Sequence, residues 1–314
     1  MANFLDIISA ISPPLFILLI GGLCRRGGWL RVEADASLSV LTVRVLYPCF
    51  FFYHLVGNQD TLSFSHFFVV TSAGFICICL GFGCSYFVAK LMGVKTTAIS
   101  SFTFCSGIFN YGFFAFPVAA SIFGEEIIAK IILFNLGVET AIWTAGIWVL
   151  ASNQFKFIRL LNPPIISIIL AVSVREIGGQ QMIPSFLWEI ITLLGSCAIP
   201  IGLLLIGGNF SDLIKNFKLS TGLRVESSAI LVRLLIFPLL IFCYALKGPI
   251  PIGMEWFRDI LIVQSAMPAG IFAIVIVKNY SGDTTTAMRA ILATMVGCLL
   301  TTPIWLYLGL RFMK

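Results

Sequence analysis

Ten long apolar stretches make up most of this chain and constrain its fold more than any other feature. A helix that crosses a lipid bilayer needs about 20 apolar residues at 1.5 Å rise per residue. Only 11% of the 314 residues are charged and 59% are hydrophobic, whereas a soluble domain carries about 25% charged residues. We therefore predict an all-α polytopic membrane protein without a soluble catalytic domain. The predicted spans are 5–24, 40–56, 66–91, 97–122, 127–151, 161–176, 183–207, 226–246, 256–278 and 285–310.

Lysine and arginine residues are distributed unevenly between the two ends of these spans. Of the 20, twelve lie near one side, six lie near the other, and Arg44 and Arg233 fall inside spans. Because cytoplasmic loops are enriched in Lys and Arg, we predict that both termini lie outside the cytoplasm and the connection 152–160 within it. Arg44 and Arg233 are close to cytoplasmic helix ends, where we expect their side chains to snorkel to the membrane surface. The scattered charges form no basic patch, so no nucleic-acid partner is predicted.

Short motifs recur in the same order in the two halves of the chain, at offsets of about 150 to 158 residues. Ser12–Leu15 recurs as Asn162–Ile165, and Gly112–Ala115 recurs as Gly270–Ala273. Five spans in each half is an odd number, so repeated halves must have opposite orientations in the membrane. We predict two inverted five-helix repeats. They cover 1–151 and 161–314 and are joined by 152–160.

The fourth and ninth spans carry polar and helix-breaking residues at mid-membrane. The fourth contains Asn110-Tyr111-Gly112 followed by Pro117, and the ninth contains Pro268-Ala269-Gly270. Proline removes a helical N–H and clashes with the preceding turn, so both helices should be interrupted at about half depth. The unpaired N–H groups of two half-helix starts would then form an anion site. Kinks that serve only helix packing are the alternative.

Several motifs occur together in order along the chain. They are Asn110-Tyr111-Gly112 with Pro117, Ile142-Trp143-Thr144, Asn162-Pro163, Ala266-Met267-Pro268-Ala269-Gly270 and Thr301-Thr302-Pro303. With them the chain resembles a bacterial member of the auxin efflux carrier family and, more distantly, the bile acid/sodium symporter fold. The resemblance implies a scaffold of segments 1, 2, 6 and 7, which dimerises, and a mobile transport unit of segments 3–5 and 8–10. It also implies that segments four and nine cross at the substrate, where Asn110 would hydrogen-bond a carboxylate.

Two residues depart from the plant members of that family, which have proline at the position of Phe109 and glutamine at that of Glu139. A carboxylate near the middle of a span costs several kcal/mol and is kept mainly for a pathway, a relay or an ion pair. Two interpretations of Glu139 therefore stay open. It is either a proton-titrating or cation-binding group beside the substrate, or one half of a structural ion pair with Arg44, Arg233 or Lys130.

The sequence contains no HExxH, GxSxG or Walker motif, so we predict neither an enzyme nor an ATP-driven pump. We predict a secondary transporter of a small carboxylate, such as an auxin-like aromatic acid, malate or malonate, that works by an elevator-like shift. It would need no cofactor and would be driven by the membrane potential or a co-transported proton. Sodium symport, and a membrane sensor without transport, are the alternatives. The predicted substrate-binding residues are Asn110, Tyr111, Gly112, Glu139, Pro268, Ala269 and Gly270, with Glu139 also the coupling candidate.

The remaining expectations concern the surroundings of the protein. We expect an integral protein of a bacterial inner membrane that contacts lipid and forms a homodimer through its scaffold helices. The nine cysteines show no paired CxxC spacing, so no metal site is predicted.

Overall fold

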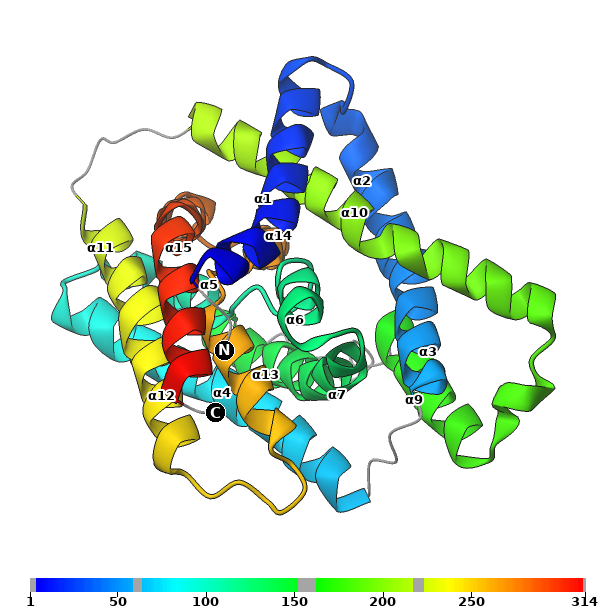
Figure 1. The fold of residues 1–314 in the computed structure, drawn as a ribbon. Helices are drawn as coiled ribbons and strands as arrows, with labels where there is room; N and C mark the ends of the chain where they lie inside the picture. Colours follow the sequence, from blue (N-terminus) through cyan, green and yellow to red (C-terminus); the bar gives the residue numbers. More distant parts are fainter. Residues whose placement is uncertain (1–3, 59–63, 152–161, 217–222, 313–314) are drawn as a thin grey trace.

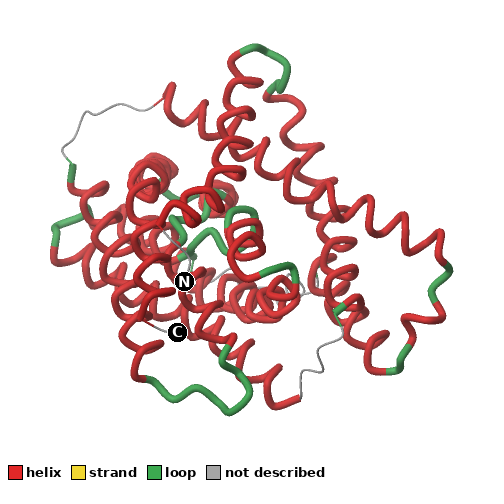
Figure 2. Tube along the Cα trace, viewed as in Figure 1, coloured by secondary structure: helices red, strands yellow, loops and turns green. Residues whose placement is uncertain are grey.

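The computed structural model describes residues 4–58, 64–151, 162–216 and 223–312. Within these ranges the chain is helical apart from its connecting loops, and the β-type pairing consists of one isolated bridge (Figure 2). The helices of the first half are α1 (Phe4–Arg26), α2 (Val32–Leu41), η1 (Thr42–Leu46), α3 (Tyr47–Gly57), α4 (Phe64–Leu91), η2 (Thr96–Ala98), α5 (Ile99–Gly107), α6 (Ala115–Phe123), α7 (Glu126–Ala141), η3 (Ile142–Gly146) and α8 (Ile147–Leu150). Those of the second half are α9 (Pro163–Glu176), η5 (Gly179–Met182), α10 (Ser185–Asn216), α11 (Arg224–Ile230), η6 (Leu231–Ile236), α12 (Phe237–Lys247), α13 (Trp256–Ala266), α14 (Phe272–Asn279) and α15 (Thr284–Phe312).

Seven helical segments of the described chain are long and apolar enough to cross a membrane, as expected for a polytopic membrane protein. They are Phe4–Arg26, Val32–Gly57, His66–Leu91, Glu126–Leu150, Ser185–Lys215, Arg224–Lys247 and Thr284–Phe312. Three predicted spans are not among them. The spans 97–122 and 256–278 are each divided into two short helices, and α9, with 14 residues, is shorter than a straight bilayer crossing requires. The ten-helix inverted repeat therefore stays a prediction, and the connection 152–160 lies outside the described residues.

Two predicted boundaries differ clearly from the observed ones. The second helical segment begins at Val32 rather than at 40, and α10 continues to Asn216 rather than ending at 207. In both places the extra turns are polar, and a helix whose backbone hydrogen bonds continue does not stop where the apolar run stops. Hydropathy locates the membrane-buried part of a helix and not its full length.

The helices pack in two groups (Figure 1). The short helix α6 contacts both groups, and the short helix α14 packs on α5 and α15 of the second. One group contains α1, α10, α9 and the α2–η1–α3 segment, and its members pack mainly on one another. The other contains α4, α5, α7, α11, α12, α13 and α15. The assignment of these groups as scaffold and transport unit stays a prediction.

Glycines set the closest helix contacts within each group. A Cβ at Gly207 of α10 would collide with the backbone of Leu18 in α1, and a Cβ at Gly137 of α7 would collide with the backbone of Thr71 in α4. Because lipid tails are as apolar as core side chains, membrane helices associate largely through such close backbone packing. These glycines therefore hold each group together.

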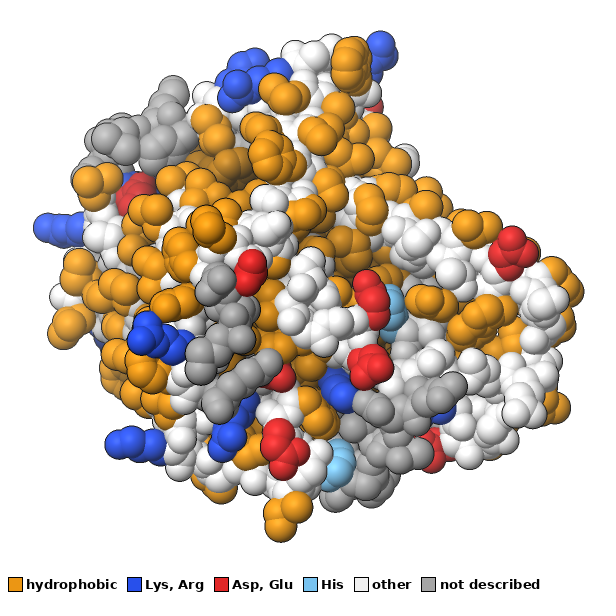
Figure 3. Space-filling model, viewed as in Figure 1, with side chains coloured by type: hydrophobic (Ala, Val, Ile, Leu, Met, Phe, Trp, Pro, Cys, Tyr) orange, Lys and Arg blue, Asp and Glu red, His pale blue; other side chains and the backbone are white. Residues whose placement is uncertain are grey.

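Large apolar side chains cover much of the outer surface, as Figure 3 shows for one face. Phe16 of α1 is 62% exposed, Phe87 of α4 is 73% exposed and Leu193 of α10 is 61% exposed. Exposed apolar area on this scale would cause aggregation in water, whereas it is the normal covering of a protein that faces lipid.

Candidate functional site

The two divided spans meet at the centre of the molecule. The first unwinds between the end of α5 at Gly107 and the start of α6 at Ala115, and the second between the end of α13 at Ala266 and the start of α14 at Phe272. Both interruptions lie inside the predicted spans 97–122 and 256–278. Pro268 cannot donate a helical hydrogen bond, which explains locally why the second helix stops where it does.

The unwound segments satisfy each other's backbone groups. Phe109 and Ala269 form an antiparallel bridge, in which the N–H of Asn110 donates to the carbonyl of Pro268 at 2.8 Å. The N–H of Gly270 donates to the carbonyl of Ile108 at 3.0 Å. The N–H and C=O groups of non-helical backbone inside a membrane need hydrogen-bond partners from protein or water. Here the two unwound segments provide partners for one another. This pairing joins the two unwound segments, 108–114 and 267–271, which together form the crossing.

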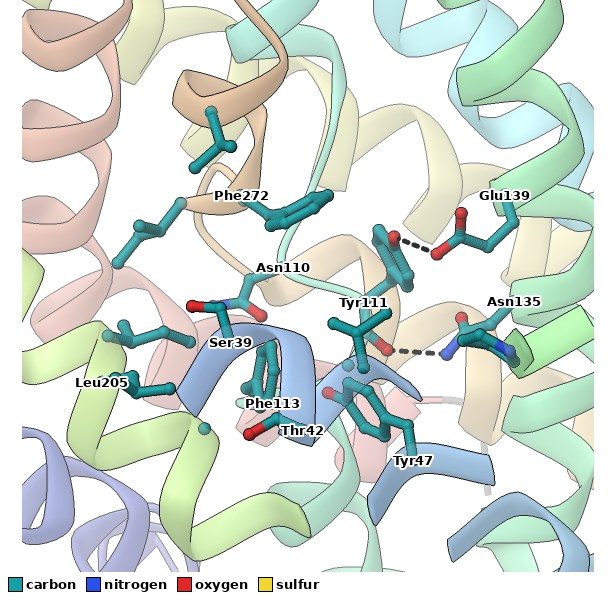
Figure 4. A pocket seen from close by; sticks show the side chains of 18 of the residues that line it. Ser39, Thr42, Tyr47, Asn110, Tyr111, Phe113, Asn135, Glu139, Leu205 and Phe272 are labelled. Atoms are coloured by element: carbon teal, nitrogen blue, oxygen red, sulfur yellow. Dashed lines mark hydrogen bonds between the residues drawn. The ribbon is translucent and has the colours of Figure 1, made fainter. Parts of the chain in front are cut away.

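A cavity of about 420 Å³ lies beside the crossing. Its walls combine both helix groups, with Ser39, Thr42, Tyr47, Gly202 and Leu205 from one side and the crossing from the other (Figure 4). Five of the predicted site residues line it, namely Asn110, Tyr111, Gly112, Glu139 and Gly270. The remaining two, Pro268 and Ala269, lie behind the cavity wall: Pro268 accepts in the bridge and the N–H of Ala269 donates to Thr294 Oγ1 at 3.2 Å.

Asn110 offers an unused amide to the cavity. Its side chain lies among the labelled lining residues in Figure 4, and the residue is only 6% exposed. The backbone N–H is engaged in the bridge, while the carboxamide forms no hydrogen bond with any residue that the structure describes. Amides in such positions are normally hydrogen-bonded, so this carboxamide is available to bind a ligand or a water molecule in the cavity.

Glu139 lies at the far side of the same cavity and is held by neutral donors. Tyr111 Oη–H donates to Oε1 at 2.6 Å and Trp143 Nε1–H donates to Oε2 at 3.0 Å. No ion pair of Glu139 with Arg44, Arg233 or Lys130 exists in the described part of the chain. The ion-pair interpretation is therefore wrong for this structure, in which Lys130 lies over the ring of Trp256, Arg233 lies against those of Phe237 and Phe109, and Arg44 is exposed.

An amide network continues behind Tyr111 and was not predicted from the sequence. Asn135 Nδ2 donates to the carbonyl of Tyr111 at 2.9 Å, and Gln264 Nε2 donates to Asn135 Oδ1 at 3.1 Å. The network joins α7 to the ninth span. The sequence did contain one indication of this network: Asn135 and Glu139 are spaced so that both lie on one face of the helix.

In the described part of the chain, three helices contain a π-helical turn, and each turn carries a residue of this region. Thr42 of η1 and Trp143 of η3 line the cavity, and Arg233 of η6 lies against Phe109 of the crossing. Such turns occur frequently at functional sites because the extra residue redirects neighbouring side chains. The sequence showed no sign of them.

Arg233 corrects a further expectation. We expected it to snorkel to the membrane surface, but its side chain is completely buried, whereas Arg44 is exposed. The reason is its neighbourhood: the guanidinium carbon lies 3.9 Å from the centre of the Phe237 ring and 5.3 Å from that of Phe109. These aromatic faces stabilise the cation inside the protein.

The cavity extends from the crossing toward one end of the molecule. Ser39, Asn162, Asn209 and Asp212 line it, and they lie near the helix ends that adjoin 27–31, 152–161 and 217–222. Asn162 also caps α9, accepting from the N–H of Ile165 at 3.0 Å. On the predicted orientation, this is the cytoplasmic end.

The fold and the site together define a class, a polytopic membrane protein built around a buried cavity at two crossing, unwound helices. A family model described as membrane transport protein matches residues 149–306, half of the chain. The chain belongs to this family of membrane transport proteins, the auxin efflux carrier family.

Two curated relatives extend the similarity over the whole chain. An uncharacterized transporter of Methanocaldococcus jannaschii is 26% identical over 305 residues, which cover 93% of this chain and 95% of the relative. An uncharacterized transporter of Methanothermobacter thermautotrophicus is 21% identical over 310 residues, which cover 96% of this chain and 98% of the relative. The family makes this a transport protein rather than an enzyme.

Proposed function

We propose that this protein is a secondary transporter of small organic anions, which bind in the cavity at the helix crossing. The observation that carries the proposal is Asn110, a residue only 6% exposed whose carboxamide borders the cavity and has no hydrogen-bond partner among the described residues. An amide N–H donor suits a carboxylate oxygen, and a hydrogen bond to a charged group contributes about 1.5–3 kcal/mol.

Two helix starts add to the preference for an anion. Gly112, Phe113 and Phe116 around the first turn of α6 line the cavity, as do Gly270, Ile271 and Phe272 at the first turn of α14. The first N–H groups of a helix have no intrahelical partner, and the helix dipole places about half a positive charge there. Two such ends at one cavity favour a carboxylate over a cation or a neutral ligand.

The volume and the lining of the cavity suit a small acid that has both apolar and polar parts. A cavity of about 420 Å³ is at the low end of the usual range for ligand sites. Tyr47, Phe51, Phe113 and Phe272 give it apolar walls, which would accept the ring of an auxin-like acid. Its polar groups would equally hold the second carboxylate of malate or malonate.

Transport would follow from movement of the crossing past the scaffold. Phe113 of the crossing packs directly on Gly202 of α10, and its ring lies 4.9 Å from that of Tyr47 in α3. These contacts between the groups are apolar, so they can be exchanged without breaking hydrogen bonds. We propose an elevator-like shift of the transport unit along a scaffold that dimerises, in a bacterial inner membrane with both termini outside the cytoplasm.

The driving force needs no cofactor. Moving one negative charge out through 100 mV of inside-negative potential yields about 2.3 kcal/mol. Uptake would instead require a co-transported cation, for which Glu139 is the proton-binding candidate because its carboxyl group lines the cavity and has no cationic partner among the described residues.

A thermal-shift panel tests the proposal. Indole-3-acetate, malate, malonate and a neutral sugar are added to purified protein, since a ligand that binds only the folded state raises the unfolding temperature. At least one carboxylate should stabilise the protein and the sugar should not.

The Asn110→Ala variant sharpens the test. It should weaken binding of the stabilising carboxylate about ten-fold or more, as expected for a lost hydrogen bond of 1–3 kcal/mol to a charged group. Asn279→Ala, which removes an exposed amide at the end of α14, is the matched control and should bind normally. Equal affinity of the Asn110→Ala variant and the wild type would contradict the proposed site.

A further inference from the structure

Arg233 is a buried cation without an acidic partner in the described part of the chain. It is 0% exposed, and its hydrogen bonding is limited to one contact, from Nη2 to the carbonyl of Ser265 at 3.2 Å. The Nε and Nη1 groups are buried and have no hydrogen-bond partner among the described residues. The titratable side chains near it are the thiols of Cys77 and Cys84 on α4. Burying an arginine in this way is costly, so a role in folding alone does not explain it.

Arg233 lies next to both unwound segments of the crossing. Its guanidinium lies against the ring of Phe109, which belongs to the first unwound segment and precedes Asn110. The carbonyl it binds belongs to the last turn of α13, immediately before the second unwound segment. The cation therefore adjoins both divided helices.

The carbonyl end of α13 is a place where a coupling cation could bind. The last carbonyls of a helix lack intrahelical partners and carry partial negative charge. In carriers built on broken helices, such carbonyls and unwound backbone coordinate the coupling sodium ion. Here the carbonyl of Ser265 accepts from Arg233, and that of Ala266 accepts from Thr302 Oγ1 at 2.7 Å. Side chains of the protein already occupy the oxygens that would coordinate such an ion.

We propose that Arg233 is a built-in cation that takes the place of a coupling sodium ion and sets the specificity of the adjoining cavity for anions. The inference rests on the proposed function and deepens it. Since a guanidinium is always charged in proteins, the preference for anions is constant and independent of sodium. Arg233 touches no substrate, because the Phe109 ring and the backbone lie between; it is a positioning residue that acts through the field at the crossing.

Three variants separate this role from a structural one. Arg233→Met keeps the bulk and removes the charge, Arg233→Lys keeps the charge, and Arg44→Met removes an exposed arginine from the π-helical turn η1 as a matched control. Binding of indole-3-acetate and malonate and the unfolding temperature are measured for each in sodium chloride and in choline chloride of equal concentration.

We expect Arg233→Met to weaken anion binding at least ten-fold while it unfolds at the same or a higher temperature, because an unpaired buried charge has been removed. Arg233→Lys should recover most of the affinity, and Arg44→Met should match the wild type. Sodium and choline should give the wild type the same affinity and unfolding temperature. Normal anion affinity in Arg233→Met would overturn the inference, as would a lower unfolding temperature that explains the lost affinity.

Failure of the proposed function is distinguishable from failure of this inference. If neither acid stabilises the wild type, the proposed organic-anion function is wrong. The role of Arg233 is then tested by the unfolding temperature of the substrate-free protein in sodium chloride and in choline chloride. A wild type that is insensitive to sodium, with an Arg233→Met variant at least as stable, supports the built-in cation. Stabilisation of the substrate-free wild type by sodium but not by choline overturns it.

Discussion

Two arginines in the second half of the chain are buried to a similar degree and yet held in opposite ways. Arg289 of α15 forms a paired interaction with Glu226 of α11, with Nε to Oε1 at 2.7 Å and Nη2 to Oε2 at 2.8 Å. Arg233 lies on two aromatic rings, with one carbonyl as its hydrogen-bond acceptor. The first has an acid of matching geometry and the second has none among the described residues.

This difference in hydrogen-bond partners distinguishes an arginine that stabilises the fold from an arginine that serves a functional site. A buried arginine that meets a carboxylate in fork geometry neutralises it and joins two helices, which folding alone can explain. A buried arginine with unsatisfied N–H groups reduces stability. Proteins keep such groups inside membranes where they serve a pathway or a ligand. The comparison therefore assigns Glu226–Arg289 to the architecture of the fold and Arg233 to the site.

The largest effect is expected from breaking the matched pair. Glu226→Ala removes the carboxylate that neutralises Arg289, and losing one partner of a buried pair costs about 3–5 kcal/mol of folding free energy. Unfolding in detergent should show a much lower midpoint than the wild type and than Arg233→Met. If Glu226→Ala and Arg233→Met unfold alike, the two arginines do not differ in the way we infer.

A smaller effect is expected at Glu139, where an acid is held by neutral donors. Glu139→Leu leaves the hydroxyl of Tyr111 and the indole N–H of Trp143 without their acceptor, at a cost of about 2–3 kcal/mol because water in the cavity replaces part of the loss. The unfolding midpoint should fall between those of Glu226→Ala and the wild type. A midpoint equal to that of the wild type would show that the two hydrogen bonds contribute nothing.

The smallest effect on stability is expected for Glu139→Gln. The amide can accept from Trp143 through its oxygen and donate to Tyr111 through its nitrogen, so stability should change by less than about 1 kcal/mol. Carboxylate binding should also persist, while the pH dependence of transport should disappear if Glu139 carries the coupled proton. A variant that transports with the pH profile of the wild type would exclude that role.

The sequence was sufficient to place the helical segments and their interruptions. Apolar length locates the spans, and Pro268 and Gly112 mark the two places where a helix is difficult to continue. Hydropathy could not locate the polar ends of the helices, which is why the beginning at Val32 and the end at Asn216 were missed. The pairing of Phe109 with Ala269 joins residues far apart in the chain, and no local pattern encodes it.

The candidate site was predictable only on the side where polar residues interrupt an apolar span. Asn110 and Glu139 stand out there, whereas Thr42, Gly202 and Leu205 on the opposite wall look like ordinary membrane residues. The π-helical turns leave no mark in composition. Arg233 was misjudged because its place near a helix end suggested snorkelling, while three-dimensional neighbours decided its burial.

Flux of labelled acid in liposomes tests the central claim most directly, that organic anions cross the membrane through the cavity beside Asn110. Purified wild type, Asn110→Ala and Asn279→Ala are reconstituted with an imposed membrane potential, and movement of labelled indole-3-acetate and malonate is followed. We predict potential-dependent flux of at least one acid through the wild type and the Asn279→Ala variant, with loss of most of it in Asn110→Ala. Flux of that acid through Asn110→Ala at the wild-type rate, or none of either acid through the wild type, would contradict the account.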